Sequence, residues 1–275
     1  MDIEIKIPKT FKRYTPSVMK KLTKLGYFDD VDEINNKSHM IFGNVPHTGV
    51  KQVKEDFYTK TTETIGMWLS GGADSAILAY ILCKKIKEEN LDIKFQPLSV
   101  RRGRGWNPIY AGYVIDFIED ELDFKMNDHI IYYPDINDEY QREIKEFRDR
   151  DMDNFNNGII DILYSGITSN PPEDDETISR NKERTRDESS ERPLESWAGF
   201  AYYINPFFRI NKKDIKELYD KYNLTYTLFP ITRSCEGSDY QSGNYTFHCG
   251  KCWWCEERMW AFGFLDNPPQ EFIYD

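Results

Sequence analysis

The sequence predicts an α/β fold, in which a parallel sheet with helices on both faces precedes a small metal-binding unit near the C-terminus. Two observations predict it. From Thr64 onward, short apolar segments alternate with amphipathic segments of helical period, as expected for strands and helices that follow one another along the chain. Four of the five cysteines then fall between residues 235 and 255, close enough in sequence to surround one metal ion.

The alternating elements can be placed by residue. Strands are expected over 64–69, 92–100, 128–134 and 159–167, and helices over 76–90, 108–122, 138–148 and 212–222, the last capped by Asn211. Strand–helix–strand units of this kind join parallel strands by right-handed crossovers. Ligands of such sheets bind at the carboxyl ends of the strands, so we expect function in the loops that follow the strands.

The chain divides into three units by composition. Residues 1–60 form a mixed N-terminal extension, residues 61–230 the main α/β domain, and residues 231–275 the cysteine-rich C-terminal unit. Residues 170–192 interrupt the main domain with charged and hydroxylated side chains, none of which is expected to anchor a core. This run predicts either a mobile lid or a plain solvated insertion.

The charge balance favours small-molecule chemistry. The 275 residues include 36 Lys and Arg against 47 Asp and Glu, a formal net charge of −11. No direct nucleic-acid partner is expected for so acidic a chain, although a local basic pocket is compatible with it. No run approaches the roughly 20 apolar residues that cross a bilayer, and the first residues lack the apolar core of a secretory signal. We therefore expect a cytoplasmic protein without a membrane partner. The sequence does not decide between a monomer and a homodimer.

The clustered cysteines predict a structural Zn²⁺ site with four thiolate ligands, Cys235, Cys249, Cys252 and Cys255. Disulfides are rare in a reducing compartment, whereas this spacing suits one tetrahedral ion. Gly250 is expected to take a positive φ in the knuckle between two ligands. We expect His248 beside the site, not on the metal. Buried reduced cysteines and a redox Cys-x-x-Cys pair remain as alternatives, although the redox pair leaves two cysteines without a role.

A phosphate-binding loop is predicted between the first buried strand and its helix, in the string Ser70-Gly71-Gly72-Ala73-Asp74-Ser75. The first amides of a helix lack partners within the helix, and its dipole is positive at this end. The glycines let a pyrophosphate approach, the serine hydroxyls can donate, and Asp74 can cap the helix or hold Mg²⁺. No lysine follows, which excludes a Walker A loop, and the G-x-G-x-x-G fingerprint is missing. A simple Gly-Gly turn with a Ser or Asp cap is the alternative.

The S-G-G-x-D-S string resembles the pyrophosphate loop of the PP-loop ATPases, also called N-type ATP pyrophosphatases. The cysteine pattern, with Asn205-Pro206-Phe207 and Asn211-Lys212-Lys213-Asp214 before it, is similar to that of the 7-cyano-7-deazaguanine synthases of the QueC family. The resemblance covers roughly residues 64–265. It implies an adenine nucleotide alpha hydrolase-like, Rossmann-like fold in which residues 61–230 bind ATP.

The resemblance also implies a reaction. The enzyme would be an ATP-dependent C–N ligase that adenylates the carboxylate of 7-carboxy-7-deazaguanine and uses ammonia to form an amide and then a nitrile, in queuosine biosynthesis or another nucleic-acid modification. ATP, Mg²⁺ and Zn²⁺ are the implied cofactors. Ser70, Asp74 and Ser75 would be catalytic, and the nucleotide would lie on residues Leu69, Ser70, Gly71, Gly72, Ala73, Asp74, Ser75 and Gly166.

Arginines follow the second predicted strand, at the edge where a nucleotide would bind. Arg101 and Arg104 can clamp a carboxylate or phosphate, and Trp106 can stack on a purine-like ring. Thr168, after the fourth predicted strand, could reach the same ligand. A solvated basic turn is the alternative for the arginines. Two other functions stay open: a PP-loop enzyme that adenylates a protein, peptide or RNA, and a non-catalytic zinc-stabilised nucleotide-binding module.

Overall fold

The computed structural model describes residues 3–14, 57–101, 107–133, 151, 153–155, 157–172, 175–178, 191–193, 202–235 and 248–266. In chain order its elements are β1 (Thr10–Tyr14), β2 (Phe57–Thr61), β3 (Thr64–Trp68), α4 (Ala73–Glu88), β4 (Lys94–Val100), α5 (Asn107–Leu122), β5 (Ile130–Tyr132), β6 (Ile162–Tyr164), β7 (Glu191–Pro193), β8 (Tyr202–Ile204), α7 (Lys212–Lys221), the 3₁₀ turn η2 (Phe229–Ile231) and α8 (Trp253–Phe262). No helix in these ranges is long and apolar enough to cross a membrane.

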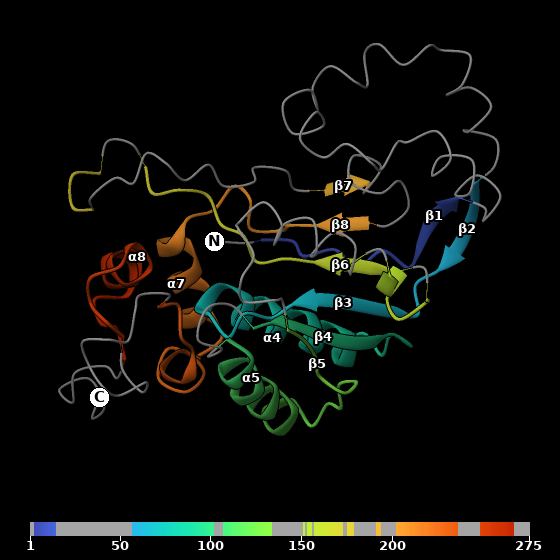
Figure 1. Cartoon of the computed structure of the whole chain (residues 1–275), viewed down its shortest axis with the longest axis horizontal. Coiled ribbons are helices and arrows are strands. Elements are labelled where there is room, and N and C mark those ends of the chain that lie inside the picture. Colours follow the sequence, from blue (N-terminus) through green and yellow to red (C-terminus); the bar gives the residue numbers. More distant parts are fainter. Residues whose placement is uncertain are drawn as a thin grey trace, which may run out of the picture.

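The main sheet contains six strands in the order β5-β4-β3-β6-β8-β7 (Figure 1). The first five are parallel, which confirms the predicted parallel sheet, and β7 pairs antiparallel with β8 at one edge. Neither β7 nor β8 was among the predicted strands. From one edge of the sheet to the other, the five parallel strands are the third, second, first, fourth and fifth along the chain. The chain thus adds strands on one side of β3 and then, from β6 on, adds them on the other side, so the direction of winding reverses between β3 and β6. In Figure 1 the carboxyl ends of these strands point toward α7 and α8.

The central strand is the most deeply buried part of the sheet. β3 pairs with β4 on one side and β6 on the other, where Ile65 stands opposite Phe95 and Ile162. All three side chains have no exposed surface. A parallel strand covered on both faces is expected to be apolar throughout, and the sequence of β3 meets that condition. The segment predicted as a fourth strand over 159–167 is shorter in the structure, at Ile162–Tyr164.

Helices α4 and α5 pack on one face of the sheet, and α7 and α8 extend the same main core beyond the carboxyl ends of the strands. The opposite face carries a second apolar cluster around Leu98, Phe155, Ile160 and Leu163. The helix predicted over 138–148 lies outside the described residues. Both faces of the sheet are therefore covered. Helices cover one face, and among the described residues the segment that leads into β6, with Phe155 and Ile160, covers the other.

The described start of the N-terminal extension belongs to the main core. Ile5, Ile7 and Phe11 are each at most 9% exposed and pack in the same cluster as α4. The Tyr164 hydroxyl of β6 donates to the Lys6 carbonyl at 2.6 Å. β1 pairs antiparallel with β2, which leads directly into β3. Residues 3–14 therefore fold with the α/β domain.

The charged insertion is anchored where the structure describes it. The Asp175 carboxylate accepts hydrogen bonds from the Trp260 indole at 2.9 Å and the Lys213 ammonium at 3.0 Å. Ile178 is only 4% exposed. The prediction that no side chain of residues 170–192 anchors to the core was wrong, because one isoleucine in a polar run carries no periodic signal that would mark it as buried.

Helix α7 starts with a complete capping box. The Asn211 side chain accepts from the amides of Lys213 and Asp214, and the Asp214 carboxylate accepts from the Asn211 amide at 2.8 Å. The predicted cap is confirmed, and it fixes the direction of the first helical residue, Lys212.

We expect Asn211→Ala to lower the free energy of unfolding by about 1 kcal/mol, because two helix amides lose their acceptor. Asn211→Gly is the matched control and should lower the free energy of unfolding by only a few tenths of a kcal/mol. Urea denaturation followed by circular dichroism measures both. Equal stability of Asn211→Ala and the wild type would contradict the role of the cap.

Candidate functional site: a phosphate loop beside a four-cysteine centre

The predicted phosphate loop lies at the point where the sheet reverses its winding. Ser70–Ser75 follow β3, and Gly166 follows β6, the neighbouring strand. In open α/β sheets this crevice, at the carboxyl ends of the strands, is the usual ligand site. The topology therefore brings the loop and Gly166 together in the position that the sequence predicted for a nucleotide.

The two serines of the loop hold each other. The Ser75 hydroxyl donates to the Gly72 carbonyl at 3.1 Å and accepts from the Ser70 amide at 3.2 Å. The two hydroxyl oxygens lie 3.0 Å apart, and the Gly72 amide donates to Ser70 Oγ at 3.2 Å. Both hydroxyls therefore shape the loop itself, and their contact with a phosphate remains a prediction.

The two glycines have different physical roles. Gly71 has a φ of +75°, and a Cβ there would lie 2.6 Å from Tyr110 Cβ and 2.7 Å from the Ala111 amide nitrogen. Gly72 has a φ of −80°, in the extended region open to any residue. A Cβ at Gly72 would have Ser70 Oγ as its nearest neighbour, at 3.2 Å. Backbone conformation therefore requires glycine at position 71 but not at position 72.

Asp74 lies in the first turn of α4, and its carboxylate forms an ion pair with the buried ammonium of Lys212. The helix N-cap is Gly72 and has no side-chain cap, so the prediction that Asp74 caps the helix was wrong. The second oxygen, Asp74 Oδ1, is buried and has no hydrogen-bond partner. A buried carboxylate oxygen without a partner is costly, and a hard cation would satisfy it. This oxygen fits a Mg²⁺ held between protein and phosphates.

The rest of the predicted nucleotide set packs around this helix start. A Cβ at Gly166 would lie 3.1 Å from the backbone of Asp74 and Ser75, so only glycine lets β6 approach α4 so closely. The Leu69 amide donates to the Leu98 carbonyl at 2.7 Å, and the Ala73 carbonyl accepts from Tyr219 at 2.8 Å. Leu69 and Ala73 therefore position the loop by their backbones.

The predicted substrate residues are only partly described. Arg101 is exposed and follows β4, where its amide donates to the Tyr132 carbonyl at 2.9 Å. Thr168 follows β6 and is only 2% exposed. Arg104 and Trp106 lie outside the described residues. The structure thus places Arg101 at the predicted edge of the sheet, and the substrate contacts of all four residues stay predictions.

Sequence reasoning missed three residues at this site. Lys212 pairs with Asp74, the Arg233 amide donates to the Gly71 carbonyl at 2.7 Å, and the Ala73 amide approaches Ser234 Oγ at 3.5 Å. Arg233 also lies over the Tyr110 ring, 5.6 Å from its centroid. The only available signal was position: Lys212 opens a capped helix, and Ser234 directly precedes a predicted metal ligand.

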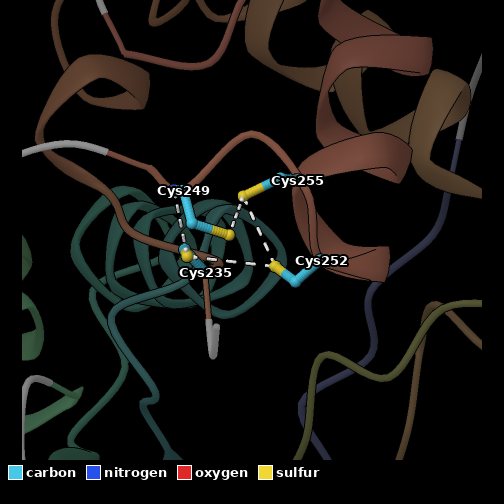
Figure 2. A group of neighbouring side chains, drawn as sticks. All are labelled: Cys235, Cys249, Cys252 and Cys255. Carbon is cyan, nitrogen blue, oxygen red and sulfur yellow. Dashed lines mark hydrogen bonds between the residues drawn. The ribbon is translucent and has the colours of Figure 1, made fainter. Parts of the chain in front are cut away.

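The four predicted metal ligands converge in space (Figure 2). Their sulfur atoms all lie within 4.8 Å of one another; those of Cys252 and Cys255 are 3.4 Å apart, and those of Cys249 and Cys255 are 3.8 Å apart. Tetrahedral sulfurs around one ion with metal–sulfur bonds of about 2.3 Å lie about 3.8 Å from one another. The set therefore fits a single ion, and Cys83, which is buried in α4, is not part of it.

Charge explains why the four sulfurs suit a cation. The hydrogen bond with Cys252 raises the pKa of the Cys235 thiol to about 11, whereas hydrogen bonds from Cys235 and Cys255 lower the pKa of Cys252. Neighbouring thiolates repel one another, so without a metal some of the four sulfurs keep their protons. A divalent ion offsets this repulsion and allows all four to be thiolates. Gly250 has a φ of +69°, as predicted, and the Lys251 amide approaches Cys249 Sγ at 3.5 Å.

His248 lies beside the cysteines without joining them. Its Nδ1 lies 2.6 Å from Asp266 Oδ1, and its Nε2 accepts from the Ser234 amide at 3.3 Å. Burial lowers the pKa of this imidazole, which favours the neutral form with its proton on Nδ1. His248 is not among the four residues that could hold the ion. It links the segments that carry Cys235 and Cys249.

We expect purified protein to contain about one equivalent of metal per chain, and Cys252→Ser to lower both metal content and melting temperature, because a structural ion contributes folding energy. Cys83→Ala is the matched control, since it removes a buried thiol far from the centre and should leave the metal in place. Native mass spectrometry and thermal denaturation measure the two effects. Purified wild type that contains no metal, and whose melting temperature does not change when Zn²⁺ is added, would contradict this assignment.

We expect Gly71→Ala to destabilise the fold by about 1–3 kcal/mol, because it combines a positive φ with a close contact to α5. Gly72→Ala should cost less, since its conformation is ordinary. Gly112→Ala, in α5, is the control: a Cβ there meets no atom within 4 Å, and the helix should gain stability. Chemical denaturation of the three variants gives the ranking, which an equal loss in Gly71→Ala and Gly72→Ala would contradict.

No protein-family model matches the chain, and no curated protein sequence matches it either. Among solved structures, the U34-tRNA thiolase NcsA from Methanococcus maripaludis, described with its [4Fe-4S] cluster, is similar with a TM-score of 0.40 and 16% identity, over 64% of this chain and 60% of that one. NAD⁺ synthetase from Burkholderia pseudomallei is similar with a TM-score of 0.33 and 11% identity, over 88% of this chain and 83% of that one. The chain thus spans less than two thirds of the thiolase. Its α/β assignment rests on its own strand order and parallel registers.

Proposed function

We propose that this protein binds ATP at the Ser70–Ser75 loop and uses it to adenylate a carboxylate, with release of pyrophosphate. One observation carries the proposal: at the reversal point of the sheet, a glycine loop joins β3 to the N-terminus of α4. The first-turn amides and the positive end of the helix favour an anion there. Gly72, whose missing side chain leaves the cradle open, has no conformational need to be glycine.

The chain's own residues supply what an activated carboxylate needs. A carboxylate resists attack by ammonia until one oxygen becomes a good leaving group, and adenylation makes that oxygen part of AMP. The amides in the first turn of α4 would hold the departing pyrophosphate, and Lys212, buried beside Asp74, would add positive charge. Asp74 Oδ1 would hold Mg²⁺, which offsets phosphate charge when it is bound. No side-chain nucleophile is required.

We propose 7-carboxy-7-deazaguanine as the substrate, on the resemblance of the loop and cysteine motifs to the 7-cyano-7-deazaguanine synthases. Attack of ammonia on the acyl adenylate forms the C–N bond and releases AMP and a proton. A second ATP adenylates the amide oxygen, and loss of AMP with a further proton leaves the nitrile. Arg101, exposed at the edge of the sheet, would bind the carboxylate or a phosphate.

We propose that the four cysteines hold Zn²⁺ in a structural role. Four thiolates fill a tetrahedral site, so no position stays open for a substrate. In a [4Fe-4S] cluster each thiolate binds a different iron, which requires the sulfurs to surround four metal atoms. Sulfurs within 4.8 Å of one another favour one ion instead. Metal analysis and the visible absorbance of an iron–sulfur cluster separate the two.

Incubation with ATP, Mg²⁺, ammonia and 7-carboxy-7-deazaguanine, followed by mass spectrometry, tests the reaction. The expected products are the amide, the nitrile, AMP and pyrophosphate. Pyrophosphate release that depends on another carboxylate would identify a different adenylating enzyme. ATP binding without turnover of any acceptor would support a non-catalytic nucleotide-binding module.

We expect Gly72→Val to abolish detectable ATP binding while the fold is retained, because its side chain would occupy the phosphate cradle. Gly112→Val is the matched control, since the space around Gly112 is open. Isothermal titration with ATP and Mg²⁺ measures the affinities, and circular dichroism checks the fold. Wild-type affinity in Gly72→Val would show that the phosphates bind elsewhere.

A further inference from the structure

The helix that starts at the metal ligand Cys252 and contains the ligand Cys255 also contacts residues that border the phosphate loop. α8 begins directly after Cys252, includes Cys255 in its first turn, and continues into Glu257 and Arg258. The last two are 1% and 0% exposed. Buried charges need partners. Glu257 has Lys212 as its partner and Arg258 has Thr232, and both partners lie in the segments that border the phosphate loop.

The first connection runs through Arg258. Its guanidinium donates to Thr232 Oγ1 at 2.8 Å and to the Phe229 carbonyl at 3.0 Å, and it stacks over the Phe229 ring at 3.7 Å. Its Nε donates to the Leu265 carbonyl at 2.6 Å. The Thr232 hydroxyl in turn donates to the Phe229 carbonyl at 2.7 Å. Arg258 therefore fixes the segment from Phe229 to Thr232 against α8.

The same segment touches the phosphate loop in its next two residues. The Arg233 amide donates to the Gly71 carbonyl at 2.7 Å, and Ser234 Oγ lies 3.5 Å from the Ala73 amide and 3.4 Å from Arg258 Nη1. Cys235, a metal ligand, follows immediately. The metal centre thus holds this segment from both ends, directly at Cys235 and through α8 at Thr232.

The second connection is the buried ammonium of Lys212. It forms an ion pair with Asp74 in the first turn of α4, and its Nζ lies 3.8 Å from Glu257 Oε2 of α8. The side chains of Lys212 and Glu257 are 4% and 1% exposed. Movement of α8 would separate charges that water does not reach, which is costly.

Charge favours the loaded centre. Four thiolates and one divalent ion carry a net charge of −2, next to the buried cation of Arg258. Burial lowers the pKa of Arg258 to about 10, and the nearby Tyr219, Asp266, Asp74 and, to the smallest extent, Cys255 oppose that effect. The charge of the centre thus acts in the same direction as the other groups that stabilise this guanidinium.

We propose that the four-cysteine centre sets the affinity of the phosphate loop for ATP, with Arg258 as the positioning residue that connects them. The proposal rests on the proposed ATP binding and adds to it a coupling between two sites. The ion keeps α8 in place, α8 holds Thr232, and Arg233 and Ser234 hold the loop backbone at Gly71 and Ala73. Because such coupling is reciprocal, ATP must also tighten metal binding by the same factor.

The first test compares metal-loaded protein with protein stripped by a chelator, whose fold is checked by circular dichroism. Isothermal titration with ATP and Mg²⁺ should show affinity weaker by about tenfold or more in the stripped protein, within the usual range of coupling. Competition with a chromophoric chelator should show zinc affinity raised by the same factor at saturating ATP. Equal zinc affinity with and without ATP would overturn the proposal.

The second test keeps the metal in place. Thr232→Val removes the hydroxyl that joins Arg258 to Phe229, and Arg258→Lys keeps the charge but loses the fork of donors. Both should retain one zinc per chain and bind ATP several-fold more weakly. Met259→Ala is the matched control, because Met259 is the next residue of α8 and is 44% exposed; it should bind ATP as the wild type does.

The outcomes separate the two proposals. A zinc-loaded wild type that does not bind ATP overturns the proposed function and this coupling together. Wild-type ATP affinity in zinc-loaded Thr232→Val and in folded, zinc-free protein overturns the coupling alone and leaves the ATP site standing. Thr232→Val is close to isosteric, so it provides this answer even where Arg258→Lys does not fold.

Discussion

The ion pair between Asp74 and Lys212 is the interaction on which the arrangement of the site depends. The Lys212 side chain is only 4% exposed, so its charge is stable there only with a carboxylate against it. This requirement places the start of α7 against the start of α4. Because Lys212 also lies near Glu257, α8 is brought to the same edge of the sheet. Charge compensation therefore joins three helices that are distant in sequence.

Close backbone contacts set the remaining geometry. Gly71 lets α5 approach the loop, and Gly166 lets β6 approach the first turn of α4; a Cβ at either would meet backbone atoms within about 3 Å. Both contacts lie beside the point where the sheet reverses its winding. The loop is thus confined on two sides by backbone. Its open side, at Gly72, is bounded by Ser70 Oγ and by Arg233 and Ser234, which belong to the segment that the metal centre holds.

Local signals predicted much of this structure. β3 and β4 were predicted because each is a largely apolar run, α4 and α5 because each is long enough to show a helical pattern, and the metal site because three of its four cysteines are close in sequence. β7 and β8, of three residues each, carry no such period, and pairing with neighbouring strands defines them. Capping of α4, one of the two roles expected for Asp74, is not found, because Asp74 lies in the first turn beyond the N-cap Gly72 and its carboxylate pairs with Lys212, 138 positions away.

The buried cations could not be predicted, because a charged residue in a sequence looks like surface until its partners are known. Lys212, Arg233 and Arg258 are 3%, 4% and 0% exposed, and all three contact the phosphate loop or the segment beside it. The net charge of −11 is a sum over the whole chain. A bound polyphosphate would interact mainly with charges within about 10 Å, because dissolved salt screens the more distant charges. A negative net charge is therefore compatible with buried cations beside the loop, where the proposed anionic ligand would bind.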